Sequence, residues 1–313
     1  MSQTQTQTQP DISYHPDFQK YQLRSDKIKA LNPSIEKLHG SFPSQMKGEL
    51  VWEGKDYTDE KQWTLVLTED HLAEIDDALK AFKDLSQTAV AGNIGAPAYS
   101  TDKQVFHTDA GDIVSLFSLN VTAKGGESKL ASSWRVYNEV AKTRPDIIKT
   151  LSEDWVFDGY GNPEKPYTTK PLLYHTPAKV GSPERVITQY ALRDFTGFLN
   201  IPRTPGISPI TEAQAEALDA LHFLAEKFSL TLDFQKGDVQ YLNNLSIFHA
   251  RDEFTDEPGK ERHWLRLWLR DPELAWETPE QLKPRWDELY KDVTEEEQVF
   301  PLEPRIRRGA GKA

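Results

Sequence analysis

The chain has 313 residues, a net charge of −12 and no cysteine. The acidic balance argues against nucleic acid or an anionic membrane as the main partner, because such surfaces attract clustered Lys and Arg. Without cysteine, disulfides and thiolate chemistry are excluded, so a metal site would have to use His, Asp and Glu. No apolar run approaches the length of a membrane span and no leader pattern is present, so we expect a cytoplasmic protein.

The first part of the chain is predicted to hold few regular elements. Residues 1–12 are rich in Gln and Thr and are expected to form a disordered tail. Short strands are expected around residues 50–52 and 63–67, and a helix is expected over residues 69–85. That helix would bury one apolar face, formed by Leu72, Ile75, Leu79 and Phe82.

Strands and helices follow in the middle of the chain. The apolar patterns predict strands over residues 105–110 and 112–119, and a helix over residues 134–151 that is broken near Pro145. Residues 154–209 contain several short strand candidates separated by Gly and Pro. We expect this segment to form a lid or pocket wall.

A second helix and a strand-rich region complete the pattern. Thr211 opens a capping-box signal, and the helix that it begins has an apolar face that ends at Phe228. Residues 231–270 are again strand-rich, with a turn expected at Asn243 and Asn244.

The remaining elements and the element count predict the fold class. A short amphipathic helix is expected over residues 284–290, and residues 301–313 form a polar tail. Many short strands with a few helices predict a mainly β fold with flanking helices (α+β), built on an antiparallel barrel or sandwich. We expect one domain over residues 13–300.

The strongest chemical signal is a set of three residues far apart in the sequence. His107 and Asp109 would point to the same face of a strand, and His249 ends an apolar run far downstream. Two imidazoles and one carboxylate with open positions opposite them are typical of non-haem Fe(II) oxygenases. The alternative is that each His is an ordinary strand residue and Asp109 a turn acid without a metal.

A predicted strand near the C-terminus adds a candidate anion site. Alternation places Arg262, Arg266 and Arg270 on one face together with two tryptophans, and leucines on the other face. We expect the leucine face to pack against a helix layer and the arginine face to line the interior. A buried guanidinium needs an anion, and its planar fork suits a carboxylate. The alternative is a solvated edge strand with the arginines outside.

These elements together resemble the Fe(II)/2-oxoglutarate-dependent dioxygenases of the taurine dioxygenase and clavaminate synthase-like superfamily. The resemblance covers about residues 50–286 and rests on the order and spacing of its elements. They are His107-Thr108-Asp109, then Gly125-Gly126-Glu127-Ser128, then His249, and finally Arg262 with Arg266. It implies a double-stranded β-helix (jelly-roll) core flanked by helices.

The resemblance also implies roles for individual residues. His107, Asp109 and His249 correspond to the iron ligands. Arg262, helped by the Ser128 hydroxyl, corresponds to the partner of the distal carboxylate of 2-oxoglutarate; Ser128 stands where many members have Thr. Arg266 corresponds to a residue that holds an anionic group of the substrate, although Arg266 and Arg270 could exchange roles. The cofactor would be Fe(II), with 2-oxoglutarate and O2 as co-substrates.

The expected activity is oxidation of a C–H bond in a small anionic or zwitterionic substrate, with succinate and CO2 as co-products. A carboxylate-bearing amino acid is the first expectation, through hydroxylation, desaturation or oxidative cyclisation. The sequence is similar to fungal secondary-metabolism members, some of which form aziridines from valine-like amino acids. A sulfonate (taurine-type) dioxygenase is the alternative within the class. From other classes, a non-catalytic metal-binding jelly-roll protein and a cupin-type isomerase remain alternatives.

Overall fold

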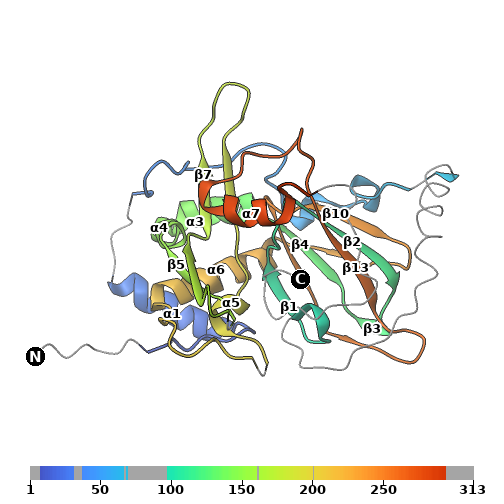
Figure 1. Ribbon diagram of the computed structural model, residues 1–313, viewed down its shortest axis with the longest axis horizontal. Helices are drawn as coiled ribbons and strands as arrows, with labels where there is room; N and C mark the ends of the chain where they lie inside the picture. The colour runs from blue at the N-terminus through green and yellow to red at the C-terminus, as the bar shows by residue number, and fades with distance from the viewer. Residues whose placement is uncertain are drawn as a thin grey trace, which may run out of the picture.

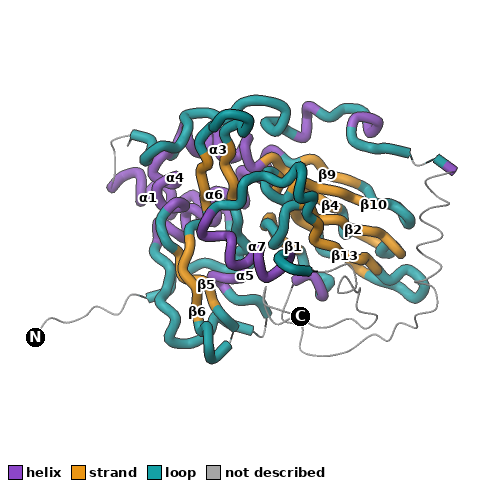
Figure 2. Tube along the Cα trace, turned by 45° about the horizontal axis from the view of Figure 1, so that its top comes forward, coloured by secondary structure: helices purple, strands orange, loops and turns teal. Residues whose placement is uncertain are grey.

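The computed structural model describes residues 8–31, 37–66, 68–69, 97–160, 162–199 and 201–293. Two antiparallel sheets dominate one end of the molecule, and helices dominate the other (Figures 1 and 2). The larger sheet has the order β1 (Gln104–His107), β11 (Ile247–Arg251), β4 (Ser128–Ser132) and β9 (Leu230–Leu232). The smaller sheet has the order β10 (Val239–Asn243), β2 (Ile113–Asn120) and β13 (His263–Leu269).

The two sheets face one another across an apolar cluster. Val114, Leu116 and Leu242 of the smaller sheet are buried there, and Leu130 and Ile247 of the larger sheet pack against them. The other face of the larger sheet carries alternate residues such as Phe248, which belong to the main core. This arrangement is the predicted jelly-roll core, and the mainly β fold with flanking helices is confirmed.

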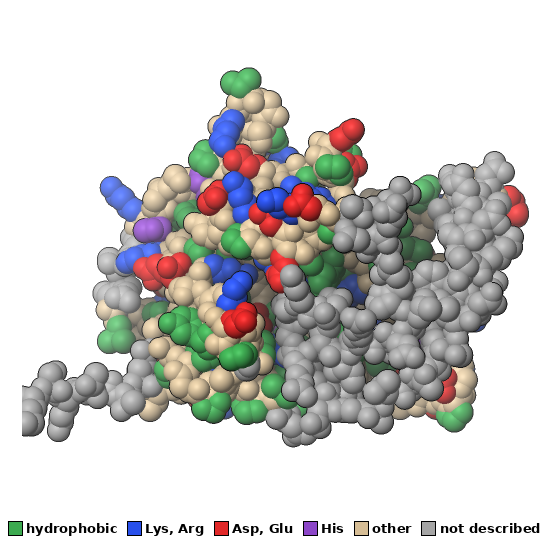
Figure 3. Space-filling view, viewed as in Figure 1, with side chains coloured by type: hydrophobic (Ala, Val, Ile, Leu, Met, Phe, Trp, Pro, Cys, Tyr) green, Lys and Arg blue, Asp and Glu red, His purple; other side chains and the backbone are tan. Residues whose placement is uncertain are grey.

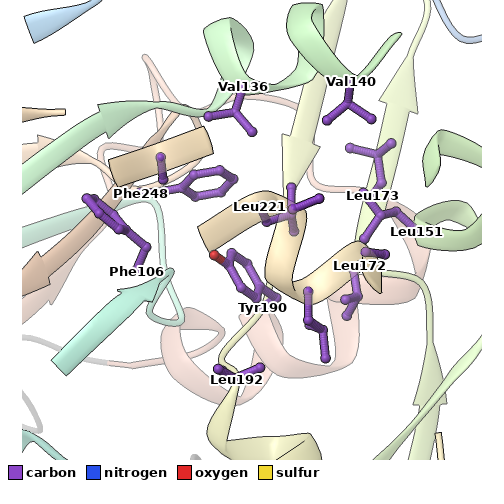
Figure 4. Close-up of a cluster of buried hydrophobic side chains, with 14 of the residues drawn as sticks. Phe106, Val136, Val140, Leu151, Leu172, Leu173, Tyr190, Leu192, Leu221 and Phe248 are labelled. Atoms are coloured by element: carbon purple, nitrogen blue, oxygen red, sulfur yellow. The ribbon is translucent and has the colours of Figure 1, made fainter. Parts of the chain in front are cut away.

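Helices cover the outer face of the larger sheet. α3 (Ser133–Thr143) and α6 (Glu212–Phe228) lie against the sheet, and α1 (Phe18–Leu31) and α4 (Pro145–Ser152) pack against α6. Figure 4 shows Phe106 and Phe248 from the sheet lying with Val136 and Leu221 from α3 and α6. Burial of these large side chains stabilises the scaffold, at roughly 25 cal/mol per Å² of apolar area removed from water.

The local signals for these helices are confirmed. The Thr211 hydroxyl accepts a hydrogen bond from the Gln214 backbone N–H at 3.1 Å, and the Gln214 side chain accepts from the Thr211 N–H at 2.9 Å. Pro145 separates α3 from α4 because it begins the second helix, where its missing N–H costs nothing. The short helix near the C-terminal end is α7 (Lys283–Tyr290).

Smaller elements fill the connections. The predicted lid contains two hairpins and a short helix: β5 (Trp155–Asp158) with β6 (Tyr167–Lys170), β7 (Leu173–Thr176) with β8 (Arg185–Thr188), and α5 (Arg193–Thr196). A two-residue ladder joins β3 (Lys124–Gly125) to β12 (Phe254–Thr255). The 3₁₀ turns are Gly54–Asp56, Glu60–Gln62, Pro97–Tyr99 and Glu280–Leu282. Among the described helices, none is long and apolar enough to cross a membrane.

Several predictions for the N-terminal part were wrong. Residues 50–52 and the described residues 63–66 form no strand, and the helix α1 was not predicted. Its apolar residues do not all share one face, since Leu23 and Leu31 are exposed while Phe18 and Tyr21 contact Phe223 of α6. Arg24 adds ionic contacts, donating to Asp219 at 2.5 Å and to Glu212 at 2.9 Å. The predicted helix over 69–85 and the tail over 301–313 lie outside the described residues, apart from Glu69.

The boundary of the N-terminal tail also differs from the prediction. Residues 1–7 lie outside the described part of the chain, but Gln9 and Ile12 already pack against the domain. The Gln9 side chain donates to the Phe195 carbonyl at 3.2 Å and accepts from the Ile210 N–H at 3.3 Å. The packed chain therefore begins before residue 12.

The two faces of β13 divide as alternation predicts, but the leucine face is not covered by a helix layer as predicted. Leu267 is 43% exposed and Leu269 is 36% exposed, whereas Trp264 and Trp268 pack into the cluster between the sheets. The arginine face therefore points inward because the tryptophans beside it supply the apolar burial. On the face of the molecule in Figure 3, charges of both signs are intermingled over the described helical part, with no basic patch there.

Candidate metal centre and active site

His107, Asp109 and His249 meet between the two sheets. One ligand atom from each residue lies within 4.8 Å of the others. Nε2 of His107 is 3.7 Å from one carboxylate oxygen of Asp109, and Nε2 of His249 is 3.8 Å from the other. The two imidazole centroids are 4.1 Å apart. The structure thus brings together the three residues that the sequence singled out.

Strand pairing explains why these residues meet. β1 and β11 are antiparallel neighbours in which His107 lies directly opposite His249. Asp109 follows the end of β1 and begins a turn that the Asn244 side chain holds in place. Asn244 accepts from the Asp109 N–H at 2.9 Å and donates to the carbonyls of Asp109 and Gly111, both at 2.7 Å. The hairpin between β10 and β11 therefore positions the carboxylate.

The two imidazoles are suited to act as neutral ligands. Nδ1 of His107 lies 2.9 Å from the Val105 carbonyl and must donate to it, which leaves a lone pair on Nε2. Burial lowers the pKa of His107, and burial followed by the neighbouring His107 lowers the pKa of His249 well below its usual value. Neither ring nitrogen of His249 has a hydrogen-bond partner among the described residues. Both rings therefore offer free electron pairs rather than positive charge.

Asp109 is held ionised by its neighbours. Nη1 of Arg266 donates to its two oxygens at 2.8 and 3.2 Å, and the indole N–H of Trp268 donates at 3.1 Å. Burial alone would raise the pKa of Asp109, but the charge of Arg266, aided by the Trp268 hydrogen bond, lowers it to about 2. The centre is thus a carboxylate and two neutral imidazoles in a buried space, a donor set that fits Fe(II). Trp268 and Arg266 would orient the carboxylate ligand.

The predicted co-substrate residues lie at the other end of the space between the sheets. The Arg262 guanidinium stacks on Trp264, with Cζ 3.9 Å from the ring centroid. Burial, followed by the charges of Arg251 and Arg266, lowers its pKa to about 9, and its Nε has no hydrogen-bond partner among the described residues. A buried cation in this condition attracts an anion. Ser128 is buried on β4, and its hydroxyl lies 3.5 Å from Oε1 of Gln240.

The turn before Ser128 explains the two glycines. Gly125 and Gly126 have φ of +75° and +82°, a region that other residues rarely adopt. A Cβ on Gly125 would lie 2.4 Å from the Glu253 carbonyl oxygen. This close approach brings the β3–β4 turn against the chain that follows β11, beside Arg251.

Arg270 lies away from the three ligands. Its Nη1 is 3.3 Å from an oxygen of Asp112 and 3.1 Å from the Thr278 hydroxyl. Asp112 also accepts from the Trp286 indole N–H at 2.6 Å. Arg270 thus fastens the helix α7 region to the turn after Asp109, and of the two candidate arginines only Arg266 reaches the centre.

Sequence reasoning missed several residues around the centre. The amide of Gln104 contacts Nε2 of His107 at 3.1 Å, and the Arg251 side chain is buried and bonded to carbonyls of residues 97–102. The Tyr190 carbonyl of the predicted lid accepts from the Thr108 N–H at 2.9 Å, and the Tyr190 N–H donates to the Thr108 hydroxyl at 2.9 Å. For Arg251 a signal existed, since it shares the strand face of His249 two residues earlier. Gln104 is only three residues from His107 but belongs to no motif, and the Tyr190 contact depends on long-range packing.

Solved structures with a similar arrangement include several oxygenases. An asparagine oxygenase in complex with Fe(II), hydroxyasparagine and succinate is 17% identical, with 57% of this chain and 53% of that chain covered and a TM-score of 0.43. A putative alpha-ketoglutarate dependent 2,4-D dioxygenase from Burkholderia xenovorans is 16% identical, with 64% and 88% covered and a TM-score of 0.40. Because these scores are low, the family assignment depends on the sequence comparisons.

A curated relative is closer in sequence. The taurine hydroxylase-like protein SAT17 of Stachybotrys chartarum is 43% identical over 202 residues, which cover 64% of this chain and 51% of the relative. This chain therefore matches about half the length of that relative. The family model for the taurine catabolism dioxygenase TauD, TfdA family matches residues 59–268, a span that includes all three candidate ligands and both Arg262 and Arg266. The chain belongs to the TauD/TfdA family of dioxygenases.

Proposed function

We propose that this protein is an Fe(II)/2-oxoglutarate-dependent oxygenase of a small zwitterionic substrate. The observation that carries the proposal is the buried grouping of His107, Asp109 and His249 within 4.8 Å, in a chain of this family. In this proposal the three side chains hold Fe(II) on one face and leave the opposite face open. When bound, iron(II) supplies the site where O2 and 2-oxoglutarate react, giving succinate, CO2 and an oxidised substrate.

Arg262 is proposed to hold the distal carboxylate of 2-oxoglutarate, at a site that Ser128 borders. Arg262 is a largely buried cation whose Nε has no hydrogen-bond partner among the described residues. A carboxylate placed against it would compensate the burial of both groups. The presence of a buried cation suited to a carboxylate also argues against a cupin-type isomerase or a passive metal-binding protein, because neither needs a second anion site.

Arg266 is proposed to orient both Asp109 and the anionic group of the substrate. Only its Nη1 is engaged in the hydrogen bonds to Asp109 that the described residues make. The rest of the guanidinium fork remains available for a carboxylate or a sulfonate. Its role would be to place the substrate C–H bond at the open face, since positioning can contribute many orders of magnitude in rate.

The substrate class follows from the charge of this arginine. An amino acid is the first candidate, through hydroxylation, desaturation or oxidative cyclisation such as aziridine formation from a valine-like amino acid. The name of the curated relative, taurine hydroxylase-like protein, supports an aminosulfonate as the alternative. The lid over residues 154–209, which Tyr190 ties to Thr108, would form the pocket wall.

The test is 2-oxoglutarate turnover with candidate substrates. Purified protein loaded with Fe(II) is incubated with amino acids and aminosulfonates, and succinate and oxidised products are measured by mass spectrometry. We expect succinate formation that depends on substrate and is abolished in His107→Ala. Succinate formation that persists in His107→Ala, or oxidation that needs no 2-oxoglutarate, would overturn the proposal.

A further inference from the structure

The space between the sheets has a polar end that the roles proposed above do not explain. Gln240 and Leu242 alternate along β10, and Leu242 packs between the sheets, so Gln240 points into the same space. Gln240 is only 6% exposed, yet its amide Nε2 has no hydrogen-bond partner among the described residues. A buried amide N–H without a partner is costly, because it has lost its hydrogen bond to water and gained none in the protein.

Other unpartnered donors lie at the same end. The Ser118 hydroxyl, the Trp264 indole N–H and Nε of Arg262 are buried and also lack partners within the described part of the chain. Ser118 and Trp264 are directly paired across β2 and β13. Four unsatisfied donors, with no carboxylate among them, describe a site built for an anion.

Contacts link these donors into one group. Oε1 of Gln240 lies 3.5 Å from the Ser128 hydroxyl, and Ser128 is paired with Arg251 across β4 and β11. The Phe254 ring contacts both Arg251 and Arg262, with Cζ 4.6 and 5.6 Å from its centroid. Gln240 therefore lies next to the cationic end of the pocket rather than beside the three ligands.

The arrangement lets Ser128 act on a bound carboxylate only indirectly, through Gln240. Oε1 of Gln240 can only accept, so the Ser128 hydroxyl donates its single proton to that oxygen. A hydroxyl that donates to Gln240 cannot also donate to a bound carboxylate. The free donor of the pair is the Gln240 amide, because the Ser128 contact is made to Oε1 and Nε2 has no partner among the described residues.

We propose that Gln240 is a co-substrate-binding residue whose amide N–H donates to the distal carboxylate of 2-oxoglutarate beside Arg262, and that Ser128 is a positioning residue that acts through Gln240. This inference rests on the proposed function, because it assigns the donors of the same anion site. The amide also sets the length of acid that fits, since it fixes the depth at which the carboxylate lies.

The experiment measures 2-oxoglutarate binding without turnover. Anaerobic calorimetric titration into Mn(II)-loaded protein gives Kd for wild type, Gln240→Met, Gln240→Asn, Ser128→Ala and Ser128→Thr, with circular dichroism to check folding. The matched control is Tyr241→Phe, because Tyr241 points to the outer face and is 66% exposed. Mn(II) affinity is measured on each variant so that loss of the metal is distinguished from loss of the co-substrate.

Loss of a hydrogen bond to a charged group predicts that Gln240→Met raises Kd about tenfold to a hundredfold, with Mn(II) affinity unchanged. Ser128→Ala should raise Kd by a smaller factor, and Ser128→Thr should restore it. Gln240→Asn keeps the amide but is one methylene shorter; it should also raise Kd and should shift preference toward the longer 2-oxoadipate.

Two results separate failure of this inference from failure of the proposed function. If Arg262→Met loses 2-oxoglutarate binding while Gln240→Met and Gln240→Asn bind as wild type does, the inference about Gln240 is wrong and the function stands. If wild-type Mn(II)-loaded protein binds no 2-oxoglutarate, the proposed function itself fails. A Gln240→Met protein that does not fold leaves Gln240→Asn and its acid-length preference as the deciding measurement.

Discussion

Arg266 donates from a single nitrogen to both oxygens of Asp109, at 2.8 and 3.2 Å. This contact joins the candidate metal centre to the site proposed for the anionic group of the substrate, because the Arg266 guanidinium borders both. It also keeps the carboxylate ionised in a space where burial would favour its protonated form. We infer that occupation of one site is felt at the other through this arginine.

The first prediction concerns Asp109 itself. Asp109→Asn removes the negative ligand and leaves the half-buried Arg266 without its charged partner, so we expect divalent-metal affinity to fall by about 100-fold or more. Calorimetric titration with Mn(II) measures the change. The matched control is Asp112→Asn three residues later, which should lower the free energy of unfolding by about 1–3 kcal/mol through loss of its Trp286 and Arg270 contacts. If Asp112→Asn weakens metal binding as much as Asp109→Asn does, the assignment of the ligand is wrong.

The second prediction concerns the indole that contacts the candidate ligand. Trp268→Phe removes the N–H that donates to Asp109 at 3.1 Å while keeping most of the packing. A hydrogen bond from a neighbouring side chain to a metal-ligating carboxylate typically contributes about tenfold to a hundredfold to metal affinity. We therefore expect Mn(II) affinity to fall within that range with little change in melting temperature. Leu267→Ala, on the exposed face of the same strand, should leave Mn(II) affinity unchanged.

The third prediction concerns the stability cost of Arg262. Burial lowers its pKa to about 9 from an ordinary value of 12.5, so below pH 9 the folded protein holds a charge that the unfolded chain carries more easily. Arg262→Met should therefore raise the free energy of unfolding at pH 7 by on the order of 1 kcal/mol when no anion is present. Added 2-oxoglutarate should stabilise the metal-loaded wild type and not the variant. Equal melting temperatures with and without 2-oxoglutarate in both proteins would contradict the anion site.

The fourth prediction is a pH dependence far from the centre. The His222 contact, opposed by burial and aided by Lys103, lowers the pKa of Glu226 from 4.5 to about 2. A depressed carboxyl pKa contributes stability that is present above pH 4.5 and is lost as the pH falls toward 2. Glu226→Gln should be less stable than wild type at pH 6, and the difference should shrink as the pH falls below 4.5. Melting temperatures of the wild type and of Glu226→Gln from pH 3 to 7 test this. A difference in melting temperature that stays constant across that range would show that ionisation of Glu226 does not contribute to stability.

Much of the centre could be predicted because strand geometry is regular. The spacing of His107 and Asp109 predicted that they lie close together, although the strand ends at His107 and Asn244 positions Asp109. The capping box at Thr211 and the break at Pro145 are local signals that need no tertiary context. The helix α1 could not be predicted in this way, since Phe18, Tyr21 and Arg24 hold it through contacts with α6, about two hundred residues away. The exposed leucines of β13 were misassigned because alternation separates two faces but does not say which one is covered.

The donors around the anion site could not be predicted for a similar reason. Gln240 carries no motif, and its role emerges only when β10 and β4 face each other and place its amide beside Ser128. Asn244 was identified as part of a turn, but its three hydrogen bonds to the Asp109 turn depend on the pairing of distant segments. Sequence pattern thus predicts candidate ligands better than the residues that orient them.

The most direct test of the account is an anaerobic visible spectrum of metal-free protein titrated first with Fe(II) and then with 2-oxoglutarate. The account predicts a weak charge-transfer band that needs both additions and is absent in His249→Ala. Fe(II) binding without any band after 2-oxoglutarate would contradict the central claim, because the metal would then be held without chelation of the co-substrate.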